Sequence, residues 1–121
     1  MSVKSLCWMG VRTPRFAETV AFYRDVLHLD QMRDEANAAS FRLDDGTELH
    51  VYGPEDEDHA FFGVGPVVGL LVDDCAGTRA RMLDAGIEFI GPVQADAGAT
   101  WNHFRGPDGN VYELMERFSA R

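Results

Sequence analysis

The sequence is poor in basic residues and has no long apolar run. Among 121 residues, 11 Lys and Arg stand against 20 Asp and Glu, which gives a formal net charge of −9. No cluster of basic side chains offers the positive field that binding to a phosphate backbone requires, so the charge balance argues against nucleic acid as a partner. The apolar runs are only a few residues long, far below the roughly 20 residues of a membrane-spanning helix. We therefore expect neither nucleic acid nor membrane as a partner.

Cysteine is scarce, and several catalytic patterns are missing. Cys7 and Cys75 are isolated in the sequence, and the first residues lack the apolar core of a secretory signal. We expect two reduced, packed thiols in a cytoplasmic protein. No phosphate-binding loop, zinc-spaced cysteine pair or Ser/His/Asp pattern is present, so nothing points to covalent catalysis. The hydrophobic share of 45% is enough for one domain with a core and without disulfides.

The first half of the chain predicts a strand, a helix and three strands. An apolar segment, residues 3–11, predicts a strand, and Thr13-Pro14 is a favourable helix start because Thr can cap and Pro loses no hydrogen bond there. The helical spacing predicts one packed face as far as Leu27, formed by Phe16, Val20, Tyr23 and Leu27. Further strands are predicted at residues 31–36, 39–43 and 48–52, with a hairpin turn at Asp44-Asp45-Gly46-Thr47. In the last strand, Glu48, His50 and Tyr52 share one face.

The second half repeats this order of elements. Residues 67–72 predict a buried strand, and Asp73-Asp74 predicts the cap of a helix that ends at Gly86. The packed face of that helix is predicted to consist of Ala76, Ala80, Leu83 and Ile87. Three strands come next, at residues 88–90, 100–105 and 111–117, the last after the turn Pro107-Asp108-Gly109-Asn110.

The two halves predict an internal repeat within a single α+β domain, residues 1–121. Its modules span about residues 3–53 and 66–118, joined by a linker at residues 54–65. His50 lies four residues after the turn glycine of the first half, and Glu113 lies four residues after that of the second. A helix on the outer face of each four-stranded unit would leave the inner faces to form a cleft.

Two segments resemble the vicinal oxygen chelate superfamily, which includes glyoxalases, bleomycin-resistance proteins and extradiol dioxygenases. They are Phe22-Tyr23-Arg24-Asp25-Val26-Leu27-His28-Leu29 and Phe104-Arg105-Gly106-Pro107-Asp108-Gly109-Asn110-Val111-Tyr112-Glu113-Leu114. The resemblance spans almost the whole chain. It implies two tandem βαβββ modules in a curved mixed sheet around a cleft, and it implies a homodimer.

The resemblance also implies where a metal ion would bind. Metal-using members take one ligand from the first strand and one from the last strand of each half, and these positions fall on Trp8, His50, Val67 and Glu113. Tryptophan and valine supply no suitable donor, whereas a divalent ion needs about three protein ligands. The expected metal residues are therefore only His50 and Glu113, with Glu48 or His103 as possible supplements.

Three functions remain open at this point. The leading hypothesis is metal-independent binding of an aromatic or cationic small molecule in the cleft, without a cofactor, as in bleomycin-resistance proteins. The alternative is a lyase, isomerase or dioxygenase that uses His50 and Glu113 with Zn, Ni, Mn or Fe. A third is a structural or regulatory dimer whose cleft its own side chains fill. No catalytic residue is assigned, and the predicted ligand-binding residues are Trp8, His50, Tyr52, Phe62, Trp101, His103 and Glu113.

Each of these residues also has a purely structural interpretation. His50 and Glu113 can form an ion pair that serves only itself. Trp8 and the other aromatic residues can fill the core, which is the more frequent role of large rings. The acidic run Glu55-Asp56-Glu57-Asp58-His59 lacks the ligand spacing of a calcium loop and is expected to be a solvated loop.

Overall fold

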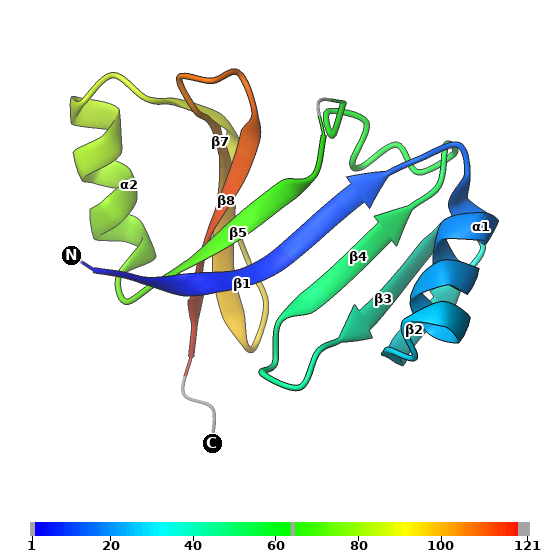
Figure 1. The fold of residues 1–121 in the computed structure, drawn as a ribbon. Helices are drawn as coiled ribbons and strands as arrows, with labels where there is room; N and C mark the ends of the chain where they lie inside the picture. The colour runs from blue at the N-terminus through cyan, green and yellow to red at the C-terminus, as the bar shows by residue number, and fades with distance from the viewer. Residues whose placement is uncertain (1, 64, 119–121) are drawn as a thin grey trace. The chain divides into compact units, whose positions relative to one another are not determined.

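The structure, a computed structural model, describes residues 2–63 and 65–118 and contains two compact units (Figure 1). Unit 1 consists of Met1–Cys7 and Val68–Arg121, and unit 2 consists of Trp8–Val67. Strand β1 (Val3–Arg12) contributes its first residues to unit 1 and its last residues to unit 2. The α+β class and the order of elements in both βαβββ modules agree with the prediction from the sequence.

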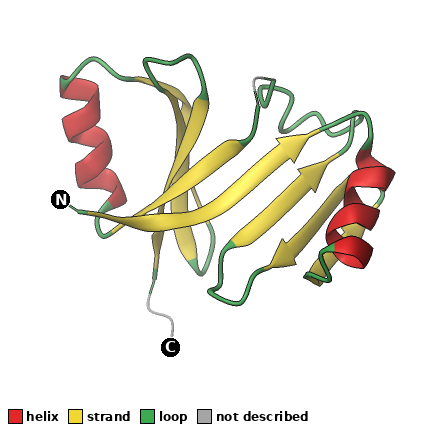
Figure 2. Ribbon diagram, viewed as in Figure 1, coloured by secondary structure: helices red, strands yellow, loops and turns green. Residues whose placement is uncertain are grey.

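Unit 2 contains four strands and one helical segment (Figure 2). Its elements are the end of β1, helix α1 (Phe16–Ala21), the π-helical turn η1 (Phe22–Val26) and strands β2 (Asp30–Glu35), β3 (Ala38–Arg42) and β4 (Glu48–Tyr52). The strand order is β2-β3-β4-β1, in which β4 pairs parallel with β1 and the other pairs are antiparallel. Each predicted strand is present to within about two residues.

The core of unit 2 lies between α1 and one face of its strands. Val20 of α1 packs in a buried cluster with Ala39, Phe41 and Val51. Strand side chains alternate between faces, so the intervening residues of β4 lie on the face away from α1. That face holds Glu48, His50 and Tyr52, as the two-residue period predicts.

The helix of unit 2 starts later than the sequence predicts. It begins at Phe16, its N-cap is Arg15, and no side chain caps it. The hydroxyl of Thr13 accepts a hydrogen bond from the backbone N–H of Arg15, so it closes a turn ahead of the helix instead.

The same helix also leaves the predicted packing face at its end. In η1 the backbone N–H of Leu27 donates to the carbonyl of Phe22, five residues earlier. A π-helical turn holds more residues than an α-helical one, so it rotates the residues after it out of phase. Leu27 is 47% exposed, and Leu29 packs against the core cluster in its place.

Unit 1 contains the start of β1 and the remaining elements. They are strand β5 (Val67–Val72), helix α2 (Cys75–Asp84) and strands β6 (Glu88–Ala95), β7 (Ala99–Arg105) and β8 (Val111–Arg117), in the strand order β1-β5-β8-β7-β6. Strands β5 and β8 have the predicted bounds. Strand β6 is longer than predicted, because it continues past Gly91 and Pro92 through a shift of register between Ile90 and Gln94.

Helix α2 has the predicted ends but not the predicted face. Asp74 caps it by accepting from the N–H of Gly77, and Gly86 has a positive φ of 88°. The predicted face was wrong at Ala76, Ala80 and Leu83, which are exposed, although Ile87 packs against the core as predicted. The residues that pack are Cys75 and Thr78, which are buried, and Met82, which is partly buried. The sequence holds two weakly apolar stripes, and contact with Phe104 and Leu114 selects this one.

Both cysteines are buried and outside any disulfide, as expected for packed thiols. The two hairpin turns form where predicted, with positive φ at Gly46 and Gly109. Among the described residues, no helix has the length and apolar character needed to cross a bilayer.

Candidate functional site

We call the strand face that lies away from α1 the open face of unit 2. It carries three hydrogen-bonded side chains of β4. Nε2 of His50 lies 3.0 Å from Oε1 of Glu48, and Nδ1 lies 2.9 Å from the hydroxyl oxygen of Tyr52. The side chains of His50 and Glu48 are 17% and 25% exposed, whereas Tyr52 is buried. The alternation of β4 therefore brings together two predicted site residues and the predicted supplementary carboxylate.

The partners of His50 fix where its proton lies. A carboxylate only accepts hydrogen bonds, so Nε2 carries the hydrogen that is donated to Glu48. In the neutral ring, Nδ1 is then the acceptor, and the Tyr52 hydroxyl donates to it. Both ring nitrogens of His50 are thus engaged within its own strand.

Aromatic rings surround this hydrogen-bonded chain. The ring of Trp8 lies 5.0 Å from that of His50, and the ring of Phe62 lies 6.0 Å from both Trp8 and Tyr52 in edge-on contacts. Trp8 and Phe62 are 6% and 4% exposed, so both rings fill space behind the polar groups. A Cβ at Gly10 would collide with the indole of Trp8, which explains the glycine at that position of β1.

The sequence did not predict two residues of this cluster, Asp56 and His59. The ring of His59 stacks on Tyr52 at 3.6 Å and 10°, and its Nδ1 and backbone N–H both lie 2.9 Å from Oδ1 of Asp56. Burial raises the pKa of Asp56, but the hydrogen bonds from His59 outweigh it, so the pKa lies below its usual value. The expectation of a solvated loop is wrong for Asp56 and His59, although their three-residue spacing was a usable signal.

Arg12 joins this loop to β1. Its guanidinium donates to the backbone carbonyls of Pro54 and Asp56. Arg15 pairs with Glu18, and Arg105 donates to the carbonyl of Gly109. Each of these three arginines is therefore engaged by a partner within its own unit.

In unit 1, the corresponding strand face away from α2 carries a carboxylate and an imidazole, both buried. His103 and Glu113 are opposite one another on β7 and β8, and Nε2 of His103 lies 3.3 Å from Oε2 of Glu113. Their side chains are only 7% and 5% exposed. Trp101, two residues before His103 on β7, lies on the same face and is partly exposed.

The residues present do not fit a resident divalent metal ion. Of the four positions implied by the resemblance, Trp8 packs against rings and Val67 is buried without a donor atom. Among the described residues, the candidate ligands on these faces are Glu48 and His50 in unit 2 and His103 and Glu113 in unit 1. Within the described parts of either unit, no three His, Cys, Asp or Glu side chains form a group that could hold a metal.

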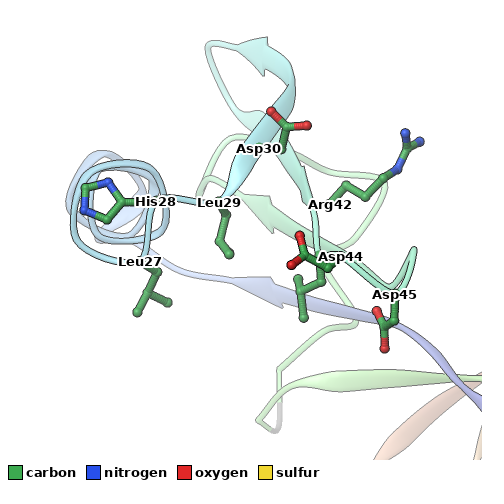
Figure 3. A pocket seen from close by; sticks show the side chains of 8 residues that line it. Leu27, His28, Leu29, Asp30, Arg42, Asp44 and Asp45 are labelled. Carbon is green, nitrogen blue, oxygen red and sulfur yellow. The ribbon is translucent and has the colours of Figure 1, made fainter.

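An open pocket of about 700 Å³ lies elsewhere in unit 2, between the end of η1 and the hairpin of β3 and β4 (Figure 3). Its lining residues are Leu27, His28, Leu29, Asp30, Arg42, Leu43, Asp44 and Asp45. None of the predicted ligand-binding residues lines it. His28 has a positive φ of 56°, so the helical segment is followed by a non-glycine residue in the left-handed conformation.

Solved structures with the same fold include a Mn(II)-bound glyoxalase and methylmalonyl-CoA epimerases. The Mn(II)-bound glyoxalase from Novosphingobium aromaticivorans is 22% identical with a TM-score of 0.75, over 98% of this chain and 42% of that one. The methylmalonyl-CoA epimerase from Mycobacterium tuberculosis is 18% identical with a TM-score of 0.72, over 94% and 88%. A variant of the Streptomyces coelicolor epimerase, in complex with 2-nitronate-propionyl-CoA, is 18% identical with a TM-score of 0.72, over 98% and 100%.

These identities establish the common fold and leave the activity open. No curated protein matches the sequence significantly. The family model of the glyoxalases and their relatives matches residues 5–114, almost the whole chain, which confirms the resemblance seen in the two sequence segments. The chain belongs to the Glyoxalase/Bleomycin resistance protein/Dioxygenase superfamily.

Proposed function

We propose that this protein binds an aromatic or cationic small molecule without a metal ion, and that the open face of unit 2 makes the contact. The observation that carries the proposal is the state of His50, whose two ring nitrogens are bonded to Glu48 and Tyr52. Such an imidazole is not poised to coordinate an ion. Its ring, which packs beside Trp8, is instead suited to contact a planar or cationic compound.

The surroundings of His50 favour the same type of ligand. The His50 ring is partly exposed, so a planar or cationic compound can contact it while the buried Trp8 and Phe62 support it from behind. Unit 2, residues 8–67, contains twelve Asp and Glu against five Arg, so it carries −7 of the total charge of −9. A field of this sign raises the local concentration of cations.

The experiment uses the two tryptophans, one in each unit. Trp101→Phe leaves Trp8 as the fluorophore, and Trp8→Phe leaves Trp101. We expect N-methylquinolinium and bleomycin, a planar cation and a cationic glycopeptide, to quench Trp8 in a saturable manner and to raise the melting temperature. The absence of both effects for both probes would contradict the proposal, because binding to the native state must stabilise it.

The metal-dependent enzyme is the competing function, and a separate measurement addresses it. We expect purified protein to contain less than about a tenth of an equivalent of Zn, Ni, Mn or Fe, and these ions to leave the melting temperature unchanged. One tightly bound equivalent of metal per chain, together with a rise in melting temperature, would contradict metal-independent binding and favour the metal-dependent enzyme.

The proposal includes a homodimer that works in the cytoplasm, where buried thiols stay reduced. Sedimentation velocity at several protein concentrations tests the dimer. A single monomeric species at tens of micromolar would contradict it.

A further inference from the structure

The carboxylate of Glu113 is buried, and one of its two oxygens lacks a hydrogen-bond partner among the described residues. The residue is 4% exposed, and its Oε2 faces His103 at 3.3 Å. Its Oε1 is buried and, in the part of the chain that the structure describes, has no hydrogen-bond partner. A buried carboxylate oxygen without a donor is unfavourable, and such atoms in native proteins call for an explanation.

The neighbours of Glu113 indicate what kind of group could supply the donor. Strand pairing places Trp101 opposite Met115, two residues along from His103 and Glu113 and on the same face. Trp101 and Met115 are both partly exposed, and the flexible methionine side chain can change rotamer when a ligand binds. An aromatic ring and a flexible apolar chain are therefore the next side chains along this face from the buried carboxylate.

We infer that Oε1 of Glu113 accepts a hydrogen bond from an N–H group of a ligand, and that the ligand is an aromatic compound with a protonated amine. Oε1 can accept from one N–H of a protonated amine and leave the others to water, whereas a divalent ion needs about three protein ligands, and the described residues of this face offer two, Glu113 and His103. A charged donor on a carboxylate forms a stronger hydrogen bond than a neutral one. This inference goes beyond the proposed function, which rests on unit 2.

The test compares two cations with the same charge and ring system, only one of which has N–H groups. The probes are 1-naphthylmethylammonium, which has three N–H groups, and its N,N,N-trimethyl derivative, which has the same charge and ring system but none. Isothermal titration calorimetry on the whole protein gives both affinities. We expect the primary ammonium to bind at least about tenfold more tightly, the ratio that one charge-assisted hydrogen bond supplies.

Variants then assign the preference to this carboxylate. Glu113→Gln should reduce the ratio of the two affinities to below about threefold, and Glu113→Asp, which keeps the charge but shortens the side chain, should also reduce it. Glu88→Gln is the matched control, because it removes an exposed carboxylate from the same unit. It should keep the ratio of the wild-type protein.

The outcomes separate this inference from the proposed function. Equal affinity for the two probes in the wild-type protein overturns the inference and leaves the binding function intact. A ratio that survives both Glu113 substitutions, or that Glu88→Gln lowers as much, also overturns it. If neither naphthyl probe binds, and the quinolinium and bleomycin titrations are also negative, both conclusions fail.

Discussion

Units 1 and 2 repeat one topology around different chemistry. The strand after each hairpin glycine carries His50 in unit 2 and Glu113 in unit 1. His50 lies in a partly exposed hydrogen-bonded chain within an acidic unit, whereas Glu113 is buried against His103 in a unit of nearly balanced charge, eight Asp and Glu against six Lys and Arg. Equivalent backbone positions thus fix where a side chain points, and its neighbours decide what it can do.

The largest effect expected from this difference concerns the two histidines. His103→Ala leaves the buried carboxylate of Glu113 without its imidazole and should lower the free energy of unfolding by about 3–5 kcal/mol. His50→Ala removes hydrogen bonds among partly exposed groups and should cost about 1–2 kcal/mol. Urea denaturation of both variants measures the contrast. If both variants lost the same free energy of unfolding, the difference in burial between His103 and His50 would have no energetic consequence.

The loop of unit 2 predicts a pH-dependent effect. The lowered pKa of Asp56 means that its contribution to stability is present above the unfolded pKa of about 4 and is lost as the pH falls through the folded value. Asp56→Asn should therefore destabilise the protein by about 1 kcal/mol at pH 7 and by progressively less below pH 4. Chemical denaturation across this range checks the trend. Asp58→Asn, at an exposed position, serves as the control and should show no such trend.

The two helices differ in their caps, and we expect a smaller effect from this difference. Asp74 caps α2 with its side chain, whereas α1 begins without a side-chain cap. Asp74→Ala should cost about 1 kcal/mol, and Thr13→Ala only a few tenths. Thermal unfolding followed by circular dichroism would reveal the difference. A larger loss for Thr13→Ala would show that its turn matters more than the cap of α2.

The thiols offer a comparison that leaves stability unchanged. Both cysteines lie in unit 1, and burial raises the pKa of Cys75, with the nearby carboxylates of Glu116 and Asp74 acting in the same direction. We expect Ellman's reagent at pH 8 to label native protein slowly and unfolded protein rapidly at both positions. Rapid labelling before any loss of Trp8 fluorescence in Trp101→Phe would show that unit 1 opens separately from unit 2.

The predictions from sequence succeeded where a short period or a turn residue governs the outcome. The two-residue period of β4 placed Glu48, His50 and Tyr52 on one face, and Gly46 and Gly109 marked both hairpins. Local backbone geometry alone sets these features. The family segments added the order of elements in both modules.

The predictions failed where packing chooses between similar local options. Of the face predicted for α2, Ile87 packs but Ala76, Ala80 and Leu83 are exposed, and Cys75 and Thr78 are the buried residues. The π-helical turn η1 places Leu27 at an exposed position, and the residue types of that segment do not predict such a turn. Weakly apolar helices carry too little contrast for their own sequence to fix the contact face.

The sequence by itself determined the α+β class, the repeat of elements, the acidity and the lack of donors at Trp8 and Val67, since these depend on residue type and local spacing. Only the tertiary structure decided the partners of each polar side chain. Glu113 lies against His103 because β7 and β8 pair in this register, and His59 stacks on Tyr52 because the loop after β4 turns back over it. Such contacts depend on register and packing, which one-dimensional patterns leave open.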